Sequence, residues 1–386
     1  MEKDNLIIFE ERGKCKMKIG INLLPVIPGK IGGMEQYVRN LISYALNVND
    51  EYEIFLFLNK QNIDTFVENN SKMRKILINE NIDNNMQLYI WIHTLKIDIW
   101  FCPMLVLEPK NINVPSVVTI PDIQHEFYPE FFEPYVLQWR NAHYEYSAKT
   151  CNAVLTISEY SKKTMVEKYK IPENKVYSIH LDSSQEFYLN HNDEINQRVI
   201  HKYQLSNYEY GFYPANTWKH KNHINLLKAM VFLKKKFNVK INMVFTGFEQ
   251  QAQKSIIDFI KENDLSEQIK FLGYLPQEEM PYVYRNAKFL VFPSLFEGFG
   301  IPLVEAMRTK TPIVCSNAGS IPEVVEDCAL LFDPTSPEDI ALKILEVLNE
   351  QTRTELINKG INQAEKFSWE KCSKSTLEVF KRVLES

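Results

Sequence analysis

The chain has 386 residues, of which 45% are hydrophobic and 24% are charged, and its formal net charge is −5. These are ordinary values for a folded globular protein of two or three domains, so disorder of the whole chain is excluded. The acidic balance disfavours a nucleic-acid binder, and no apolar run approaches the ~18 residues of a membrane-spanning helix.

The N-terminal residues 1–16 are polar and unlike the rest of the chain, so we expect a flexible extension there. No signal peptide is expected, because the apolar run Leu6–Phe9 is too short. The cysteines form no C-x-x-C motif and are expected to be reduced and mostly buried thiols, as in a cytosolic protein. There are six of them: Cys15, Cys102, Cys151, Cys315, Cys328 and Cys372.

The first half of the chain alternates short apolar runs with amphipathic stretches, which is the pattern of βαβ units in a parallel sheet. A strand is predicted over 18–24, followed by a loop from Pro25 to Gly33 and a helix with apolar residues at helical spacing from Met34 to Leu46. Further strands are predicted at 53–58, 99–102, 115–120 and 153–157. The aromatic segment Phe127–Tyr146 is predicted to be helical core, with a wall on which a ligand stacks as the alternative.

Residues 183–208 are mostly polar and aperiodic, and we predict a linker there. A second alternating series comes next, with strands near 209–213, 241–246, 269–272, 288–292 and 312–315, and helices near 222–236, 249–263, 301–308 and 336–349. A final helix is predicted from Trp369 to Leu384. We therefore expect two α/β domains with a ligand cleft between them, residues 17–195 together with helix 369–386, and residues 200–366.

Glycine is scarce, with 12 in the chain, yet five of these fall within Gly29–Gly33 and Gly298–Gly300. Such clusters indicate that the backbone approaches something closely. Residues 289–306 are typical of a buried strand, a glycine turn and a helix start, where free N–H groups favour a phosphate. Glu305 in this helix could accept from both hydroxyls of a vicinal diol, and Glu297 lies eight residues earlier. An ordinary βα unit, with acids that only complement the helix dipole, is the alternative.

The segment Glu297–Ala306, EGFGIPLVEA, contains an E-x7-E motif and closely resembles the retaining glycosyltransferases of family 4. That family has the GT-B fold, in which two Rossmann-like domains face each other across a cleft and a C-terminal helix crosses back to the N-terminal domain. The resemblance covers most of residues 17–386. It also includes Gly32-Gly33, Lys219–His223, Gly273–Pro276, Thr311–Val314, Gly319–Glu323 and Phe367–Trp369.

The resemblance implies a binding site for a nucleoside-diphosphate sugar. Glu305 would hold the ribose hydroxyls, Glu297 would contact the transferred sugar, and Lys221 would offset the charge of the leaving diphosphate. Backbone N–H groups from Phe299 to Leu303 would meet the pyrophosphate and sugar. The other residues implied to line the donor site are Gly32, Gly33, Asn216, Tyr274, Leu275, Gly298, Gly300, Ile301 and Pro302.

Two positions depart from the family pattern. Asn216 stands where many members have arginine, so the phosphates would depend more on Lys221, or on Lys219 or Arg285 as substitutes. Many members also have a His-Asp pair after the fourth strand, where this chain has Pro121-Asp122. Asp122 matches the aspartate, and His125 is a candidate for the histidine, with a structural role as its alternative. The implied catalytic residues are Lys221, Glu297, Asp122 and His125.

The function implied by the resemblance is retaining transfer of a sugar to a hydroxyl of a glycan or polyprenyl-linked acceptor, in surface polysaccharide biosynthesis. The alternatives are a catalytically silent GT-B partner subunit, a sugar-nucleotide epimerase and a sugar phosphorylase. The chain lacks a D-x-D motif, which argues against the metal-dependent single-Rossmann transferases. No metal is expected, because Lys221 and helix N–H groups would supply the positive potential, and no other cofactor is expected. Arg140 could pair with an acceptor phosphate or an acidic neighbour.

The location implied is the cytoplasm, where the protein could lie on the inner face of the membrane. A basic stretch of five lysines is usually a solvated face, but it could also contact anionic lipid. These lysines are Lys162, Lys163, Lys168, Lys170 and Lys175. No nucleic-acid partner is expected, and we assign no oligomeric state.

Overall fold

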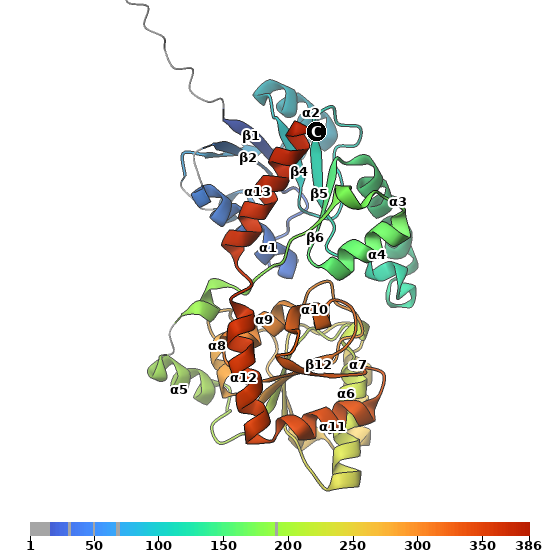
Figure 1. The fold of residues 1–386 in the computed structure, drawn as a ribbon, viewed down its shortest axis with the longest axis vertical. Helices are drawn as coiled ribbons and strands as arrows, with labels where there is room; N and C mark the ends of the chain where they lie inside the picture. The colour runs from blue at the N-terminus through green and yellow to red at the C-terminus, as the bar shows by residue number, and fades with distance from the viewer. Residues whose placement is uncertain (1–15, 30–31, 49–50, 67–69, 190–191) are drawn as a thin grey trace, which may run out of the picture.

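The computed structural model describes residues 16–29, 32–48, 51–66, 70–189 and 192–386. The predicted N-terminal extension lies outside these residues except for Lys16. The described chain forms two α/β domains, which lie one above the other in Figure 1. The predicted fold class is therefore confirmed by the two separate parallel sheets.

The N-terminal domain contains a seven-stranded parallel sheet with the strand order β3-β2-β1-β4-β5-β6-β7. Its central strands are buried on both faces, as expected for parallel strands covered by helices on both sides. The strands are β1 Met17–Asn22, β2 Tyr52–Leu58, β3 Met73–Leu77, β4 Ile99–Cys102, β5 Ser116–Thr119, β6 Ala153–Thr156 and β7 Val176–Ser178. The helices between them are α1 Gly33–Val48, α2 Asn84–Leu95, α3 Pro134–Thr150 and α4 Glu159–Tyr169.

The C-terminal domain contains a six-stranded parallel sheet with the order β10-β9-β8-β11-β12-β13. Its strands are β8 Gly211–Pro214, β9 Met243–Thr246, β10 Ile269–Phe271, β11 Phe289–Phe292, β12 Ile313–Ser316 and β13 Ala329–Phe332. Its helices are α5 Asp193–Lys202, α6 His223–Phe232, α7 Gln253–Glu262, α8 Met280–Asn286, α9 Ile301–Arg308, α10 Ile321–Val325, α11 Pro337–Val347 and α12 Glu350–Ala364. Ser336 caps α11, because its side chain accepts from Asp339 N, as the sequence Ser-Pro-Glu-Asp suggests.

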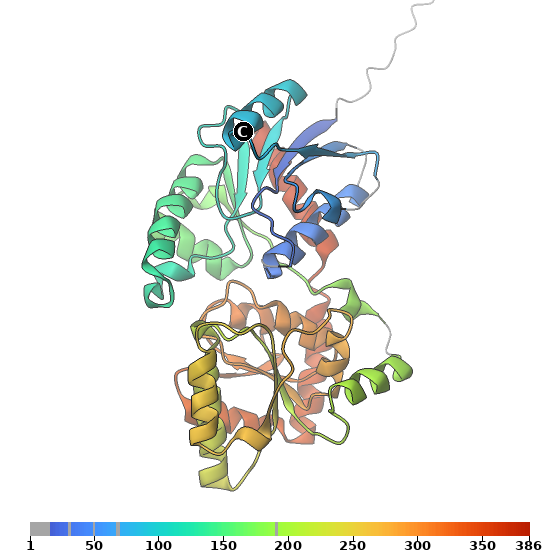
Figure 2. The same cartoon turned by 180° about the vertical axis from the view of Figure 1, so that it is seen from behind.

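The last helix, α13 Trp369–Glu385, crosses back to the N-terminal domain and lies beside α1 (Figure 1). Phe380 packs on Phe101 with ring centres 5.1 Å apart, and Ser373 Oγ donates to Leu41 O at 3.1 Å. The two segments that join the domains lie together in Figure 2. They are tied by Trp369 Nε1, which donates to Ser183 O at 2.7 Å. The predicted crossing of the C-terminal helix is therefore confirmed.

The predicted linker over 183–208 is wrong in part, because α5 and the 3-10 turn Gln185–Tyr188 lie within it. Helix α5 is mostly polar, but it buries Val199 and Ile200 and contacts α8. Four helices and strands of the C-terminal domain, α8, α10, β13 and α12, were not predicted either. Tertiary packing stabilises such short or polar segments without a clear periodic pattern.

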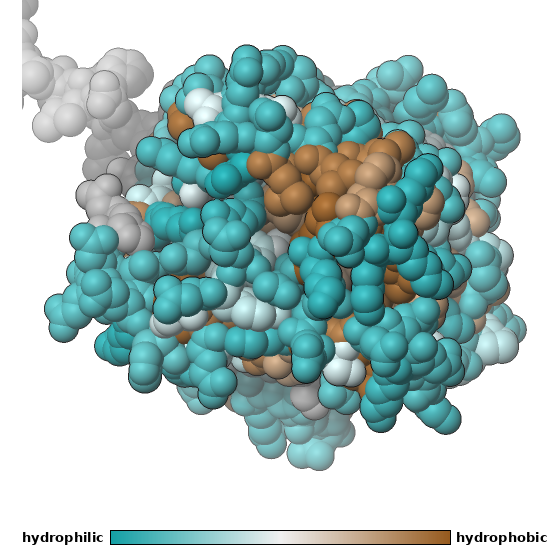
Figure 3. Space-filling model, turned by 90° about the horizontal axis from the view of Figure 1, so that it is seen from below, coloured by the Kyte–Doolittle hydropathy of each residue, from teal (hydrophilic) through white to brown (hydrophobic). Residues whose placement is uncertain are grey.

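The surface of the C-terminal domain seen from below in Figure 3 has a hydrophobic area within a hydrophilic surround. Exposed apolar side chains of this domain include Leu342 on α11, Leu348 directly after α11 and Phe237 after α6. Within the described residues, no helix combines the length and the apolar character that a bilayer crossing requires. The five described cysteines are free and buried, and Cys15 lies outside the described residues.

Candidate functional site

Each sheet has one place where the strand order reverses, between β1 and β4 in the first and between β8 and β11 in the second. In open parallel sheets, ligands bind beyond the carboxyl ends of the strands at such points. A cavity of about 1390 Å³ lies between the domains there. Its walls include Gly32, Gly33 and Gln36 of the first domain and Asn216 and Tyr274 of the second. A smaller cavity of about 250 Å³ adjoins it and is lined by Asn216, Lys221, Tyr274 and Leu275.

Lys221 and Glu297 meet at this site although they are 76 residues apart in sequence. Lys221 ends the 3-10 turn Lys219–Lys221 after β8, and Glu297 comes after β11, so two adjacent strands position them. The Lys221 Nζ donates to Glu297 Oε1 at 2.6 Å, and the two side chains are 18% and 13% exposed. The structure therefore brings the predicted phosphate cation and the predicted sugar-binding carboxylate into direct contact.

The loop that carries Glu297 is held by the segment after β12. Gly319 packs against the Glu297 backbone, and a Cβ there would lie 2.9 Å from Glu297 O. Ser320 Oγ donates to Glu297 O at 3.0 Å and to Phe299 O at 3.2 Å. These contacts fix the loop without using the carboxylate of Glu297.

Asp122 of the first domain reaches the same loop. A Cβ at Gly298 would lie 2.7 Å from Asp122 Oδ2, so only glycine lets this carboxylate come so close. Burial raises the pKa of Asp122, while its hydrogen bond from Gln124 N and the charges of Arg140 and Lys221 lower it, and the charge of Glu297 raises it. Asp122 therefore lies within electrostatic reach of both Lys221 and Glu297.

His125 is not brought into this group. It is 1% exposed and packs within the first domain, with its ring 5.0 Å from the ring of Tyr144 and with Tyr169 Oη 3.4 Å from its Nε2. Burial and the charge of Arg140 lower the pKa of His125 to about 4, so the ring is neutral at pH 7. The structure thus favours the structural alternative for His125, because its surroundings are the aromatic core under α3.

Helix α9 begins after Gly300, whose φ of +103° is a conformation that favours glycine. Two of the predicted backbone donors are not available, because Pro302 has no N–H and Leu303 N donates to Gly300 O at 2.9 Å. The N–H groups of Phe299, Gly300 and Ile301 have no acceptor among the described residues. A Cβ at Gly33 would lie 3.7 Å from Ile301 Cδ1, so the first glycine loop faces the start of α9.

Glu305 is 6% exposed, and Tyr284 Oη donates to its Oε2 at 2.6 Å. Burial raises the pKa of Glu305 to about 7, the Tyr284 hydrogen bond opposes this, and the charge of Glu186 adds to it. Glu186 lies in the 3-10 turn Gln185–Tyr188 and lines the large cavity. Tyr284 and Glu186 were missed in the sequence, because neither belongs to a motif.

The side chain of Asn216 stabilises the loop after β9, because its Oδ1 accepts from Phe248 N at 2.7 Å. Phe248 stacks on Tyr274 with ring centres 4.8 Å apart and planes at 15°, and both rings are exposed at the rim of the cavity. Leu275 beside them is buried. Phe248 comes after β9 as Tyr274 comes after β10, so its position after a parallel strand was the signal that could have found it.

Lys219 and Arg285, the possible substitutes for the arginine that Asn216 replaces, form no hydrogen bond or ion pair with the Glu297 loop among the described residues. Lys219 is exposed at the start of the 3-10 turn that Lys221 ends. Arg285 of α8 donates to Leu189 O at 3.1 Å, and burial lowers its pKa. Of the three cations, Lys221 is the one that contacts the Glu297 loop in the described chain.

The two domains touch around this site. Glu323 at the start of α10 accepts from Glu159 N at 2.8 Å and Tyr160 N at 3.0 Å. These two N–H groups lie in the first turn of α4 and have no acceptor within that helix. His180 Nε2 lies 2.6 Å from Glu323 Oε1. These bonds join the domains beside the Glu297 loop and lower the pKa of Glu323, although its burial acts in the opposite direction.

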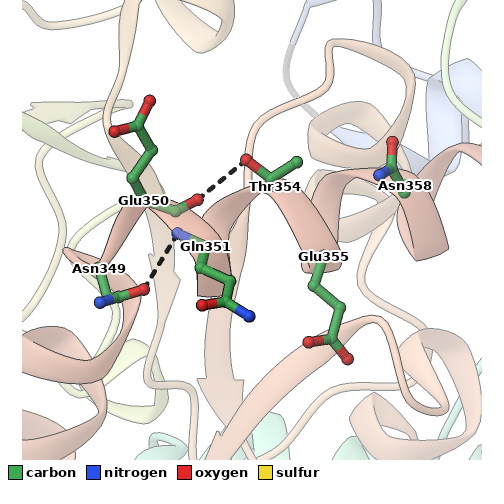
Figure 4. A pocket seen from close by; sticks show the side chains of 6 residues that line it. All are labelled: Asn349, Glu350, Gln351, Thr354, Glu355 and Asn358. Atoms are coloured by element: carbon green, nitrogen blue, oxygen red, sulfur yellow. Dashed lines mark hydrogen bonds between the residues drawn. The ribbon is translucent and has the colours of Figure 1, made fainter.

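Other features of the surface lie apart from this chemistry. The described residues contain no group of three or more His, Cys, Asp or Glu side chains that could hold a metal ion. A hollow at the start of α12 is lined by Asn349, Glu350, Gln351, Thr354, Glu355 and Asn358 (Figure 4). There Asn349 Oδ1 accepts from Gln351 N at 3.0 Å, which is an ordinary helix cap.

Comparison with known proteins shows a clear relationship. The family model described as "Glycosyl transferases group 1" matches residues 198–367. O-antigen chain mannosyltransferase B of Escherichia coli is 30% identical over 267 residues, which cover 69% of this chain and 70% of that protein. O-antigen chain mannosyltransferase RfbU of Salmonella typhimurium is 28% identical over 219 residues, which cover 57% of each chain.

Solved structures share the fold. A glycosyltransferase from Rickettsia africae ESF-5 has a TM-score of 0.72 at 17% identity, covering 96% of this chain and 99% of that one. HepE of Anabaena, solved with UDP and glucose, has a TM-score of 0.70 at 17% identity, covering 95% and 100%. The family-model match and the E. coli relative, which is 30% identical over 70% of its length, establish that the chain belongs to the group 1 glycosyl transferases.

Proposed function

We propose that this glycosyltransferase moves a hexose from a nucleoside diphosphate to a hydroxyl of a glycan or polyprenyl-linked acceptor, with retention of anomeric configuration. The observation that carries the proposal is the contact of Lys221 with Glu297 beside the start of α9. A cation, a carboxylate and free N–H groups at one point suit a sugar joined to a diphosphate.

In this proposal the nucleotide lies against the second domain. The ribose hydroxyls donate to Glu305, whose Oε2 accepts from Tyr284 and whose Oε1 accepts no hydrogen bond from the described residues. The diphosphate meets Lys221 and the N–H groups of Phe299, Gly300 and Ile301, and the base lies near Tyr274 and Leu275. The cavity has room for a nucleotide sugar together with part of an acceptor, at about 1390 Å³.

Departure of the nucleoside diphosphate increases the negative charge on its phosphate, and Lys221 stabilises this charge in the transition state. The acceptor hydroxyl attacks from the same face as the leaving group departs, and the leaving phosphate oxygen takes its proton. Glu297 then has the role of orienting the sugar hydroxyls rather than acting as a base. The positive potential comes from protein groups, so no metal is required in the proposed reaction.

The biological setting we propose is assembly of a surface polysaccharide, because two relatives are named as O-antigen chain mannosyltransferases. Mannose is accordingly the first sugar to test. We place the protein in the cytoplasm, at the inner face of the membrane. The basic stretch on α4 and the residues after it adds little to this membrane contact, because Lys162 pairs with Glu173, Lys168 covers the Phe127 ring and Lys175 donates to Lys149 O.

Thermal unfolding with UDP, GDP, dTDP and ADP tests the donor site. A nucleotide present at 100 times its dissociation constant adds about 2.7 kcal/mol to the free energy of unfolding, which raises the melting temperature by several degrees. We expect one of the four to act and Glu305→Ala to abolish the effect. If none of them stabilises the folded protein, the proposed donor site is wrong.

The reaction itself is tested with the sugar nucleotide of the base found in this way. Slow hydrolysis of the donor without acceptor distinguishes an enzyme from a catalytically silent subunit, which would release no sugar. The anomer released or transferred, monitored by NMR, tests retention. An inverted product would contradict the proposed mechanism while leaving the donor site intact.

A further inference from the structure

Arg140 of α3 is held between aromatic rings in the first domain. Its guanidinium carbon lies 4.5 Å from the centre of the Phe132 ring and 5.4 Å from that of the Tyr144 ring. Stacking on ring faces fixes the plane of a guanidinium and leaves the N–H groups at its edge free to donate. The side chain is therefore oriented before any ligand arrives.

The guanidinium of Arg140 has no hydrogen-bond acceptor or ion-pair partner among the residues that the structure describes. Other arginines do have one: Arg39 bonds Glu35, Arg74 bonds Glu53 and Arg308 bonds Asp182. Arg140 is half-buried, so part of its hydration is lost without a hydrogen bond to a described protein anion in its place. An external anion would complete its bonding.

The charge of Arg140 reaches the point where the domains meet. Burial raises the pKa of Asp122, the carboxylate packed against Gly298, and the charge of Arg140 opposes this rise; the same charge contributes to the lowered pKa of His220 in the other domain. His220 precedes Lys221, and Leu295 N donates to His220 O at 2.8 Å. The guanidinium thus lies in the same electrostatic neighbourhood as the proposed reaction centre.

The donor diphosphate already has Lys221 and the start of α9, both on the second domain. We propose that Arg140, on the first domain, binds an oxyanion of the acceptor, a phosphate or carboxylate close to the hydroxyl that attacks. This inference rests on the proposed function and narrows the acceptor from any glycan to an anionic one. The planar fork of arginine matches two oxygens of either group.

Two other roles for Arg140 make different predictions. A purely structural brace would affect stability but no anion affinity. A counter-ion for Asp122 would shift the pH dependence of activity, again with no change in anion affinity. Binding of a small anion is therefore the measurement that separates the three roles.

The experiment titrates the full chain, saturated with the nucleoside diphosphate that stabilises it, with inorganic phosphate and separately with acetate. We expect Arg140→Gln to weaken binding of the preferred anion by about 10- to 100-fold, as for a lost charge-assisted hydrogen bond. Arg140→Lys should retain part of the affinity, because the charge remains. The matched control is Arg74→Gln on the edge strand β3, where Arg74 also covers a ring, that of Phe55.

The preferred anion identifies the source, phosphate for a phosphorylated acceptor and acetate for a carboxylated sugar. Equal anion affinity in wild type and Arg140→Gln, or no anion binding to the wild type, would overturn the inference. A loss of nucleotide affinity in Arg140→Gln would also overturn it, because Arg140 would then belong to the donor site. If no nucleotide binds the wild type, it is the proposed function that fails and not the inference about Arg140. Circular dichroism of Arg140→Lys controls for folding.

Discussion

Replacing Glu305 by glutamine is expected to stabilise the folded protein above pH 7 and, at the same time, to weaken its binding of nucleoside diphosphates. The carboxyl group is almost fully buried and has one neutral donor, Tyr284 Oη at 2.6 Å. Burial disfavours the charged form more than this hydrogen bond favours it, so the pKa is raised from 4.5 to about 7. Glutamine keeps the shape and an oxygen for Tyr284 but carries no charge.

The shift in pKa sets the magnitude. Between pH 4.5 and pH 7 the folded protein binds the proton of Glu305 more tightly than the unfolded chain does, so its free energy of unfolding falls as the pH rises. Below this window both states are protonated and nothing is lost. A difference of about 2.5 pKa units corresponds to a loss of about 3 kcal/mol from the free energy of unfolding, which is complete only above pH 7. Glu305→Gln removes this loss, because glutamine has no charge to bury.

The assay is urea unfolding of both proteins at intervals between pH 4.5 and pH 8. We expect the two to have similar stability at pH 4.5, and the variant to be more stable by up to about 3 kcal/mol at pH 8. Parallel curves across this range would refute the reasoning, because the buried carboxyl group would then have its ordinary pKa.

Nucleotide binding is expected to change the pKa of Glu305 in the direction opposite to burial. Ribose hydroxyls donate to an ionised Glu305 and lower its pKa, so at pH 7 nucleotide binding should release up to about half a proton. Calorimetry in two buffers of different ionisation enthalpy measures this release. The release should be absent in Glu305→Gln, which should bind the nucleotide more weakly although it is more stable. Unchanged affinity in the variant would show that Glu305 does not contact the nucleotide.

Lys221→Ala should lower the rate of sugar transfer about 10²- to 10³-fold with an unchanged circular dichroism spectrum, and Lys221→Arg should restore part of the rate. Near-normal activity in Lys221→Ala would show that another residue binds the phosphate. Gly298→Ala should lower activity at least about tenfold, because its Cβ would lie 2.7 Å from Asp122 Oδ2. In the Asp122→Ala background the same change should be harmless, and additive losses would contradict the contact. Glu323→Gln should increase the radius of gyration in solution scattering, since it weakens the bonds to the start of α4; an unchanged radius would mean that other contacts hold the domains.

The sequence by itself determined the two parallel sheets and the segment around Glu297. Buried parallel strands produce continuous apolar runs, and the helices between them have period 3.6, so both patterns are visible locally. The helix start at Ile301 is visible for the same reason, because Gly300 and Pro302 act within their own turns. Helix α5 was missed, since its polar sequence is stabilised by contacts with α8 that local patterns do not contain.

Only the tertiary structure decided which distant residues meet. Lys221 contacts Glu297 because β8 and β11 are neighbours in the sheet, a pairing that no local pattern encodes. Asp122 and His125 are three residues apart, yet one reaches Gly298 across the cleft and the other is buried under α3. From the sequence, Arg140 could pair either with an acidic residue of the protein or with a phosphate of the acceptor. Only the arrangement of the two domains shows that Arg140 has no hydrogen-bond acceptor among the described residues. Side-chain charge is encoded in the sequence, but whether that charge is paired depends on packing between segments far apart in the chain.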